Sequence, residues 1–145
     1  MLWRMGGEES TSYNGTFPDV GNGIWYTDAI AWSSNKKIIT GYQDTGKFMP
    51  SSPISRQELA VMIYRYANLV NLDTSKKDDL SKFKDSGSVA GYAKEAVQWA
   101  VGSGIISGKY QGSQLDPTGE TSRAECAIMI DRFFKMLLSE SIKNC

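Results

Sequence analysis

The sequence has no histidine, and this absence removes a large share of enzyme chemistry. Without imidazole there is no Ser-His-Asp or Cys-His nucleophilic site, and no histidine general base or metal ligand. Cysteine is also scarce, and the two residues present, Cys126 and Cys145, do not form a CxxC pair. We interpret Cys126 as a small apolar core residue in preference to a reactive thiol. No metal cluster, cofactor motif or activated nucleophile remains, so an enzyme is the least favoured class of function.

An excess of charge and a long apolar run are missing too. The 145 residues contain 16 Lys and Arg against 16 Asp and Glu, which gives a formal net charge of zero. This balance argues against a nucleic-acid partner, because nucleic acid is bound through clustered cations. We expect no membrane insertion, and residues 1–7 lack the apolar stretch of a signal peptide. Either such a signal has been removed or the chain is a piece of a longer protein.

The sequence does contain an internal repeat. The tetrapeptide SRQE at 55–58 returns as SRAE at 122–125, 67 residues later. Other pairs match at the same offset: Ala29 with Ala96, Trp32 with Trp99, Gly41 with Gly108, Pro50 with Pro117, and Met62 with Met129. Two copies of this size are too small to stand apart, so we expect them to share a core.

The repeat divides the chain into five segments. These are a polar leader at 1–16, repeat one at 17–70, a connector at 71–82, repeat two at 83–138 and a tail at 139–145. We expect the leader to be loosely ordered and the tail to fray, as terminal residues commonly do. The charged connector is interpreted as a solvated link between the repeats.

Each repeat is predicted to form two helices. The first lies near 25–34 in repeat one, and its equivalent in repeat two has one apolar face made by Ala93, Ala96, Val97, Ala100 and Val101. Asn35 and Gly102, which match each other, are predicted to end these helices in the left-handed conformation. The second helix begins at the tetrapeptide. The expected fold is mainly α: tandem helical hairpins with short extended loop segments, packed into a shared bundle.

The tetrapeptide has the form of a capping box. In such a motif the serine hydroxyl accepts a hydrogen bond from the backbone of the glutamate, whose carboxylate accepts one from the serine N–H. Ser55 with Glu58 and Ser122 with Glu125 are therefore predicted helix caps. This interpretation explains the serine and the glutamate without any ligand.

The arginine of the tetrapeptide needs another explanation, because the positive end of the helix dipole disfavours a cation there. Arg56 and Arg123 beside helix N-termini would suit a carboxylate or a phosphate. Alternatively, each pairs with an acidic residue of the neighbouring repeat. The residues by themselves leave both interpretations open.

Taken in order, these residues resemble the S-layer homology (SLH) module. Its pattern is Phe-x-Asp, an aromatic residue before an Ala-rich helix, two hydrophobic residues followed by x-Gly, Phe-x-Pro, and Thr/Ser-Arg-x-Glu at a second helix. Copy one supplies Phe17, Asp19, Val20, Trp25, Ala29, Ile30, Ile38, Ile39, Gly41, Phe48, Pro50 and the tetrapeptide at 55–58. Copy two supplies Phe83, Asp85, Tyr92, Ala96, Val97, Trp99, Ile105, Ile106, Gly108, Leu115, Pro117 and the tetrapeptide at 122–125. The match extends from Phe17 to about Leu137.

The resemblance implies a non-catalytic anchoring module outside a bacterial cell, at the wall or S-layer. Such modules bind a secondary cell-wall polysaccharide, often pyruvylated, in grooves between repeats. The ligand-binding candidates implied for this chain are Arg56, Arg123, Ser55, Ser122, Trp25, Tyr92, Gly41, Gly108 and Asp44. The arginines would hold a ketal carboxylate, and the aromatic candidates Trp25 and Tyr92 would pack on sugar rings. Trp32 and Trp99 are expected in the core.

The sequence also departs from the family pattern. SLH modules usually occur in threes, so two repeats would leave an apolar bundle face for self-association or for a third repeat from elsewhere. The loop at 41–46 contains Asp44, whereas the loop at 108–112 has no acid, which would make the two sites unequal. The alternative function is an SLH-fold scaffolding or oligomerisation module that binds no carbohydrate.

Overall fold

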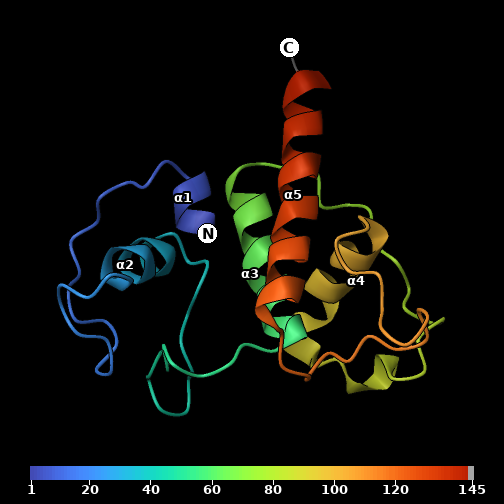
Figure 1. Ribbon diagram of the computed structural model, residues 1–145, viewed down its shortest axis with the longest axis horizontal. Coiled ribbons are helices and arrows are strands. Elements are labelled where there is room, and N and C mark those ends of the chain that lie inside the picture. The colour runs from blue at the N-terminus through green and yellow to red at the C-terminus, as the bar shows by residue number, and fades with distance from the viewer. Residues whose placement is uncertain (144–145) are drawn as a thin grey trace. The chain divides into compact units, whose positions relative to one another are not determined.

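The computed structural model describes residues 1–143, and within them the chain is helical with no β-sheet (Figure 1). The helices are α1 (Leu2–Met5), α2 (Thr27–Asn35), α3 (Arg56–Leu69), α4 (Lys94–Gly102) and α5 (Arg123–Lys143), with 3-10 turns η1 (Ser86–Ser88) and η2 (Gly91–Ala93). The predicted mainly α fold is therefore confirmed. The chain forms two compact units, Met1–Ser52 and a second that starts at Pro53.

The first unit is built on α2 and is more ordered at its start than the sequence indicates. Helix α1 packs against α2, and Leu2 is buried. The Glu9 carboxylate accepts a hydrogen bond of 3.2 Å from Trp32 Nε1 and forms an ion pair of 3.2 Å with Lys36. The expectation of a loosely ordered leader is thus wrong for residues 1–9. The buried side chain of Leu2 and the two partners of the Glu9 carboxylate hold this segment against α2.

The second unit contains α3, α4 and α5 around an aromatic core. Trp99 of α4 and Phe133 of α5 are fully buried, with ring centroids 6.3 Å apart. Tyr64 and Tyr66 of α3 each contact this pair, at 5.5 Å from Trp99 and 5.8 Å from Phe133. Both Trp99 and its counterpart Trp32 are buried, where the sequence places core residues. The second helix of repeat one therefore packs with the helices of repeat two.

The left-handed residues after the first helices lie two positions later than predicted. Asn35 and Gly102 are still helical, and the left-handed residues are Lys37, at φ 58°, and Gly104, at φ 75°. The end of α2 is a Schellman motif, because the next residue, Ile38, donates from its N–H to the carbonyl of a residue five positions back, at 2.8 Å.

Gly102 is a glycine for a different reason. A Cβ there would lie 2.6 Å from the Lys76 carbonyl oxygen, because the connector runs along α4. The Asp78 N–H also donates to the Gln98 carbonyl oxygen at 2.9 Å. The connector at 71–82 is therefore attached to α4 at these points, although most of its side chains are exposed.

The duplicated glycines of the loops lie directly under phenylalanine rings. A Cβ on Gly41 would lie 2.5 Å from Phe17, and one on Gly108 would lie 2.8 Å from Phe83. Both glycines also have positive φ, at 68° and 62°. The phenylalanine that opens each repeat and the loop glycine of the same repeat therefore contact each other directly.

Each repeat also ties its loop with a carboxylate. Asp85 accepts hydrogen bonds of 2.8 Å from the backbone N–H groups of Leu115 and Asp116. Asp19 accepts equivalent bonds in repeat one, and its pKa is lowered, chiefly by the bond from the Phe48 N–H. These bonds hold the chain in place just before the prolines that precede α3 and α5.

Helix α5 corrects the expectation for the tail. The sequence predicts fraying at 139–145, but α5 continues to Lys143, and positions 144–145, including Cys145, lie outside the described residues. Within the second unit α5 runs past the end of α3 (Figure 1). Cys126 is half-buried, and its burial raises the pKa of the thiol.

Candidate functional site

The two tetrapeptides form helix caps. At α3 the Glu58 N–H donates to Ser55 Oγ at 3.3 Å, and the Ser55 N–H donates to the Glu58 carboxylate at 2.8 Å. At α5 the matching distances between Glu125 and Ser122 are 3.2 Å and 2.9 Å. The serines and glutamates of both motifs are therefore engaged in local structure.

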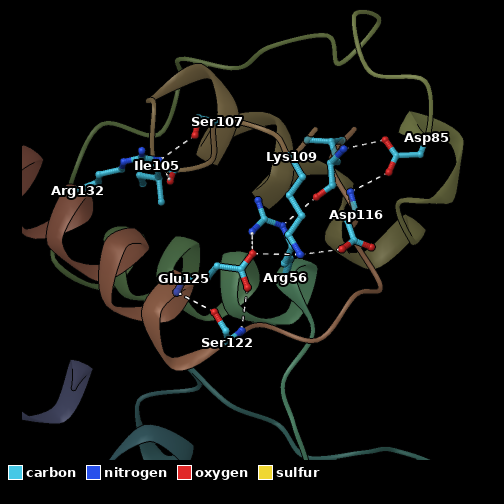
Figure 2. Close-up of polar contacts among 10 residues, drawn as sticks. Arg56, Asp85, Ile105, Ser107, Lys109, Asp116, Ser122, Glu125 and Arg132 are labelled. Atoms are coloured by element: carbon cyan, nitrogen blue, oxygen red, sulfur yellow. Dashed lines mark hydrogen bonds and ion pairs between the residues drawn. The ribbon is translucent and has the colours of Figure 1, made fainter. Parts of the chain in front are cut away.

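Arg56 points into repeat two and is only 6% exposed. Its Nε donates to the Leu115 carbonyl oxygen at 2.9 Å, and its Nη1 forms an ion pair of 3.0 Å with Glu125 (Figure 2). The first tetrapeptide is thus joined to the second, arginine to glutamate. Of the two interpretations left open for this arginine, the structure shows the pairing with an acidic residue of the neighbouring repeat.

The N-terminus of α3 is also occupied by repeat two. The backbone N–H of Arg56 donates to the Gly119 carbonyl oxygen at 3.1 Å, and that of Gln57 donates to the Pro117 carbonyl oxygen at 2.9 Å. The Gln57 side chain accepts from the Ala90 N–H at 3.0 Å. An anion therefore finds no open helix N-terminus at α3.

Lys109 completes the ion pairs around Glu125. Its Nζ lies 2.8 Å from Asp116 and 3.1 Å from Glu125 (Figure 2). The hydrogen bond from the Ser122 N–H, and then Lys109, lower the pKa of Glu125 to about 2. The hydrogen bond to Asp116 is the main reason that the pKa of Lys109 is raised. The network therefore contains two cations, Arg56 and Lys109, and two carboxylates, Glu125 and Asp116, so their formal charges cancel.

Sequence reasoning missed Lys109 and Asp116 as members of this network. Their positions in repeat one are held by Tyr42 and Met49, so comparing the two copies gave no signal. The only hint was local: the loop at 108–112 carries a cation where the first loop has a tyrosine.

Arg123 differs from Arg56 in its surroundings. The residue is exposed, and no ion pair or hydrogen bond reaches its side chain from any part of residues 1–143. Within the same residues no acceptor meets the backbone N–H groups of Arg123 and Ala124. The same motif is therefore closed at the start of α3 and open at the start of α5.

The two aromatic candidates face solvent at the same place in each repeat, just before the first helix. Trp25 is 88% exposed and touches Tyr26 edge to face, with centroids 5.2 Å apart. Tyr92 is 65% exposed and belongs to η2, which packs against α3. Partial burial raises the pKa of Tyr92, the nearby Glu58 carboxylate adds to this, and the Arg65 guanidinium opposes it.

The remaining candidates lie in the loops. Gly41 and Gly108 pack beneath phenylalanine rings, and Asp44 is exposed in the turn at 43–45. The second unit brings Ser55, Arg56, Ser122 and Glu125 together, with Gly108 next to Lys109 in the chain. Trp25, Gly41 and Asp44 belong to the first unit.

The arrangement offers binding chemistry. Among the described residues no three His, Cys, Asp or Glu side chains gather in a way that would hold a metal ion. None of the helices in these residues has the length and apolarity needed to cross a membrane. Among the candidate residues, the surface presents an exposed cation, Arg123, at the start of α5 and the exposed rings of Trp25 and Tyr92.

Several known proteins are similar to this chain. An exoglucanase, XynX, of Acetivibrio thermocellus is 31% identical over 90% of the chain and 12% of its own length. A surface-layer 125 kDa protein of Lysinibacillus sphaericus is 30% identical over 80% of the chain and 10% of its own length. A cellulosome-anchoring protein of A. thermocellus is 29% identical over 81% of the chain and 25% of its own length.

The chain therefore spans a quarter or less of each of these relatives. Two of the three are named for a surface-layer protein and for cellulosome anchoring. The model of the S-layer homology domain matches twice, at residues 16–60 and 82–127. These matches contain both tetrapeptides and both glycine loops. The chain thus belongs to the S-layer homology domain family, and it carries two tandem copies of the domain.

Proposed function

We propose that the chain is a non-catalytic module that anchors a bacterial surface protein by binding an anionic secondary cell-wall polysaccharide. Membership of the S-layer homology family and the relatives named for surface-layer and anchoring roles support this function. The observation that carries it is the pair of aromatic rings, Trp25 and Tyr92, exposed at the same position of both repeats. A ring exposed to this extent buries little apolar area on folding, whereas it provides a flat apolar surface for a sugar ring.

Arg123 supplies the positive charge of the proposed site. Its guanidinium fits a carboxylate with two parallel hydrogen bonds, and the open N–H groups at the start of α5 favour the same anion. Arg56 already has Glu125 and the Leu115 carbonyl as partners. A pyruvate ketal on the polysaccharide would supply the carboxylate.

The test is a pull-down with purified wall polysaccharide, in native form and after chemical removal of pyruvate. We expect Tyr92→Ala and Arg123→Ala each to weaken binding about tenfold or more, and removal of pyruvate to abolish the effect of Arg123→Ala. Tyr110→Ala is the matched control, because Tyr110 is an equally exposed tyrosine in the loop at 108–112. Undiminished binding by both variants would contradict the proposal.

Scaffolding without carbohydrate is the second candidate function, and one observation favours it. Arg56 joins the two repeats as a buried ion pair, which is a structural task. If the chain is such a scaffold, neither native nor pyruvate-free polysaccharide binds it. The Trp25→Ala, Tyr92→Ala double variant then gives the same pull-down result as the parent.

A further inference from the structure

Two Asn-Gly dipeptides are exposed in the first unit, at Asn14-Gly15 and at Asn22-Gly23. Both glycines have positive φ, at 78° and 71°, and nothing lies within 4 Å of the place where a Cβ would stand. Glycine leaves the carboxamide of a preceding asparagine open to attack by the next backbone nitrogen, because it has no side chain and its backbone is freely variable. Each dipeptide is therefore a candidate for spontaneous deamidation.

Deamidation needs no reactant other than water. The nitrogen of the following residue bonds to Cγ of the asparagine and gives up its proton, and ammonia leaves as a cyclic imide closes. Water then adds to either carbonyl of the imide and opens the ring. The product is an aspartate or, more often, an isoaspartate, in which Cβ has become part of the main chain. The net change replaces a neutral amide with a carboxylate.

The structure separates the asparagines by the state of the backbone N–H that would attack. The N–H after Asn35 donates to the Trp32 carbonyl oxygen at 2.9 Å, and so cannot approach its neighbour's side chain. The N–H after Asn71 donates to the Ala67 carbonyl oxygen, also at 2.9 Å. In the described part of the chain no acceptor meets the N–H of Gly23. The attacking group is therefore free after Asn22.

The side chain of Asn22 is free as well. The Asn14 carboxamide oxygen accepts a hydrogen bond from the Thr16 hydroxyl, which holds that side chain in one orientation. Asn22 is exposed, and no partner reaches its side chain from any described residue. A side chain that rotates freely reaches the geometry for attack more often than one that is held. Of the two dipeptides, the one at Asn22 is thus the better placed to react.

The turn at 21–24, which contains this dipeptide, is closed by a single hydroxyl. Thr27 Oγ1 donates to the Gly21 carbonyl oxygen at 2.7 Å and accepts from the Ile24 N–H at 3.1 Å. Thr27 is the first residue of α2 and is buried. Isoaspartate at position 22 adds a main-chain atom between the two groups that this hydroxyl bridges. The modification therefore disturbs the turn that Trp25 directly follows.

Repeat two lacks this site. By the repeat offset of 67 residues, the matching dipeptide is Val89-Ala90, which has no carboxamide. The Ala90 N–H also donates to the Gln57 side chain at 3.0 Å. The corner before the first helix is therefore chemically stable in repeat two and reactive in repeat one.

We propose that Asn22 is a site of spontaneous deamidation, and that its conversion weakens ligand binding at Trp25 as the protein ages. The new carboxylate lies close in the chain to a ring that is proposed to hold an anionic polysaccharide, so like charges oppose binding. The altered turn also moves the ring. The effect on binding rests on the proposed function, whereas the modification itself does not.

The first test is peptide mapping by mass spectrometry after incubation of the full chain at mildly alkaline pH, with fragmentation that separates aspartate from isoaspartate. Asn14 is the matched control, because glycine follows it too. We expect Asn22 to react at least about threefold faster than Asn14 in the folded chain, and the two rates to become nearly equal in urea. Thr16→Val should bring the folded Asn14 rate up to that of Asn22. An Asn22 that stays intact, or reacts no faster than Asn14, would overturn the proposal.

The second test compares fresh and incubated protein in the pull-down with native wall polysaccharide. Asn22→Gln is the control, because glutamine keeps the amide but has to close a larger and less favourable ring. We expect incubation to weaken binding of the parent about threefold or more and to leave binding of Asn22→Gln unchanged. Equal binding by fresh parent and by parent with deamidated Asn22 would overturn the effect on binding.

The two tests separate this inference from the proposed function. A fresh parent that binds no polysaccharide would overturn the proposed function and the effect on binding with it. The peptide map would still decide whether Asn22 is modified, because that measurement involves no ligand.

Discussion

At the scale of single residues, the arginine of the repeated tetrapeptide has different surroundings in the two repeats. Arg56 and Arg123 hold the same position in nearly identical tetrapeptides, yet the first is buried between repeats and the second is open to solvent. The difference comes from the segments that reach each residue in the folded chain. Repeat two supplies Glu125 and the Leu115 carbonyl to Arg56, and the described residues supply nothing equivalent to Arg123.

Arg56→Ala should therefore destabilise the second unit strongly. The change leaves the Leu115 carbonyl unpaired and removes an ion pair that is mostly buried, so we expect a loss of about 2–4 kcal/mol in the free energy of unfolding. Urea denaturation followed by tryptophan fluorescence measures it. Arg123→Ala is the matched control and should change stability by no more than about 0.5 kcal/mol. Equal effects of the two substitutions would contradict the asymmetry.

Glu125 should make the second unit sensitive to acid. Its folded-state pKa of about 2 lies below the ordinary value of 4.5. A group with a lowered folded pKa stabilises the fold above its unfolded pKa and loses that contribution as the pH falls. Stability should thus decline between about pH 5 and pH 2, and Glu125→Gln should flatten the decline while lowering stability at pH 7. Parallel curves for the variant and the parent would contradict this assignment.

At the scale of elements, glycines decide how the loops meet the core. Gly41 and Gly108 combine positive φ with a phenylalanine ring against the position of a missing Cβ. Gly104 allows the left-handed end of α4, whereas Lys37 adopts the same conformation in repeat one as an ordinary residue. A left-handed helix end therefore does not require glycine in this repeat, whereas the loop position beneath the ring does.

Gly108→Ala tests the contribution of the ring contact. We expect it to cost about 2–4 kcal/mol, because the new methyl group meets Phe83 and the residue must keep a positive φ. Gly112→Ala is the control: its φ is also positive, at 82°, but nothing lies within 4 Å of a Cβ there. That control should cost about 1 kcal/mol. Thermal unfolding of the two variants compares strain alone with strain plus overpacking.

At the scale of the whole molecule, the sequence repeats and the compact units do not coincide. The sequence predicts that repeat one extends to residue 70, but its second helix, α3, belongs to the unit that starts at Pro53. The reason is packing: α3 contacts α4 and α5, and Arg56 and Gln57 bind the loop of repeat two. A repeat here is a unit of sequence whose two helices serve different neighbours.

This division predicts where the chain can be cut. A fragment that starts at residue 53 should retain helix content and unfold cooperatively, because it keeps α3, α4 and α5 together. A fragment that starts at residue 71 begins at the repeat boundary and loses α3, which exposes Trp99. Its fluorescence should be that of a solvated tryptophan. Cooperative unfolding of the shorter fragment with a buried tryptophan would contradict the division.

The sequence by itself was sufficient for the two helices of each repeat, the buried tryptophans and the S-layer homology family, because periodicity and duplicated motifs are local properties. Comparing the copies could not show that Arg56 is paired and Arg123 open, since their neighbours in sequence are nearly the same. The same comparison could not identify Lys109 and Asp116, because other residues hold the matching positions of repeat one. Only the tertiary structure decides these points. Ion pairs and buried faces depend on which segment reaches each helix, and that segment lies about 60 residues away for Arg56.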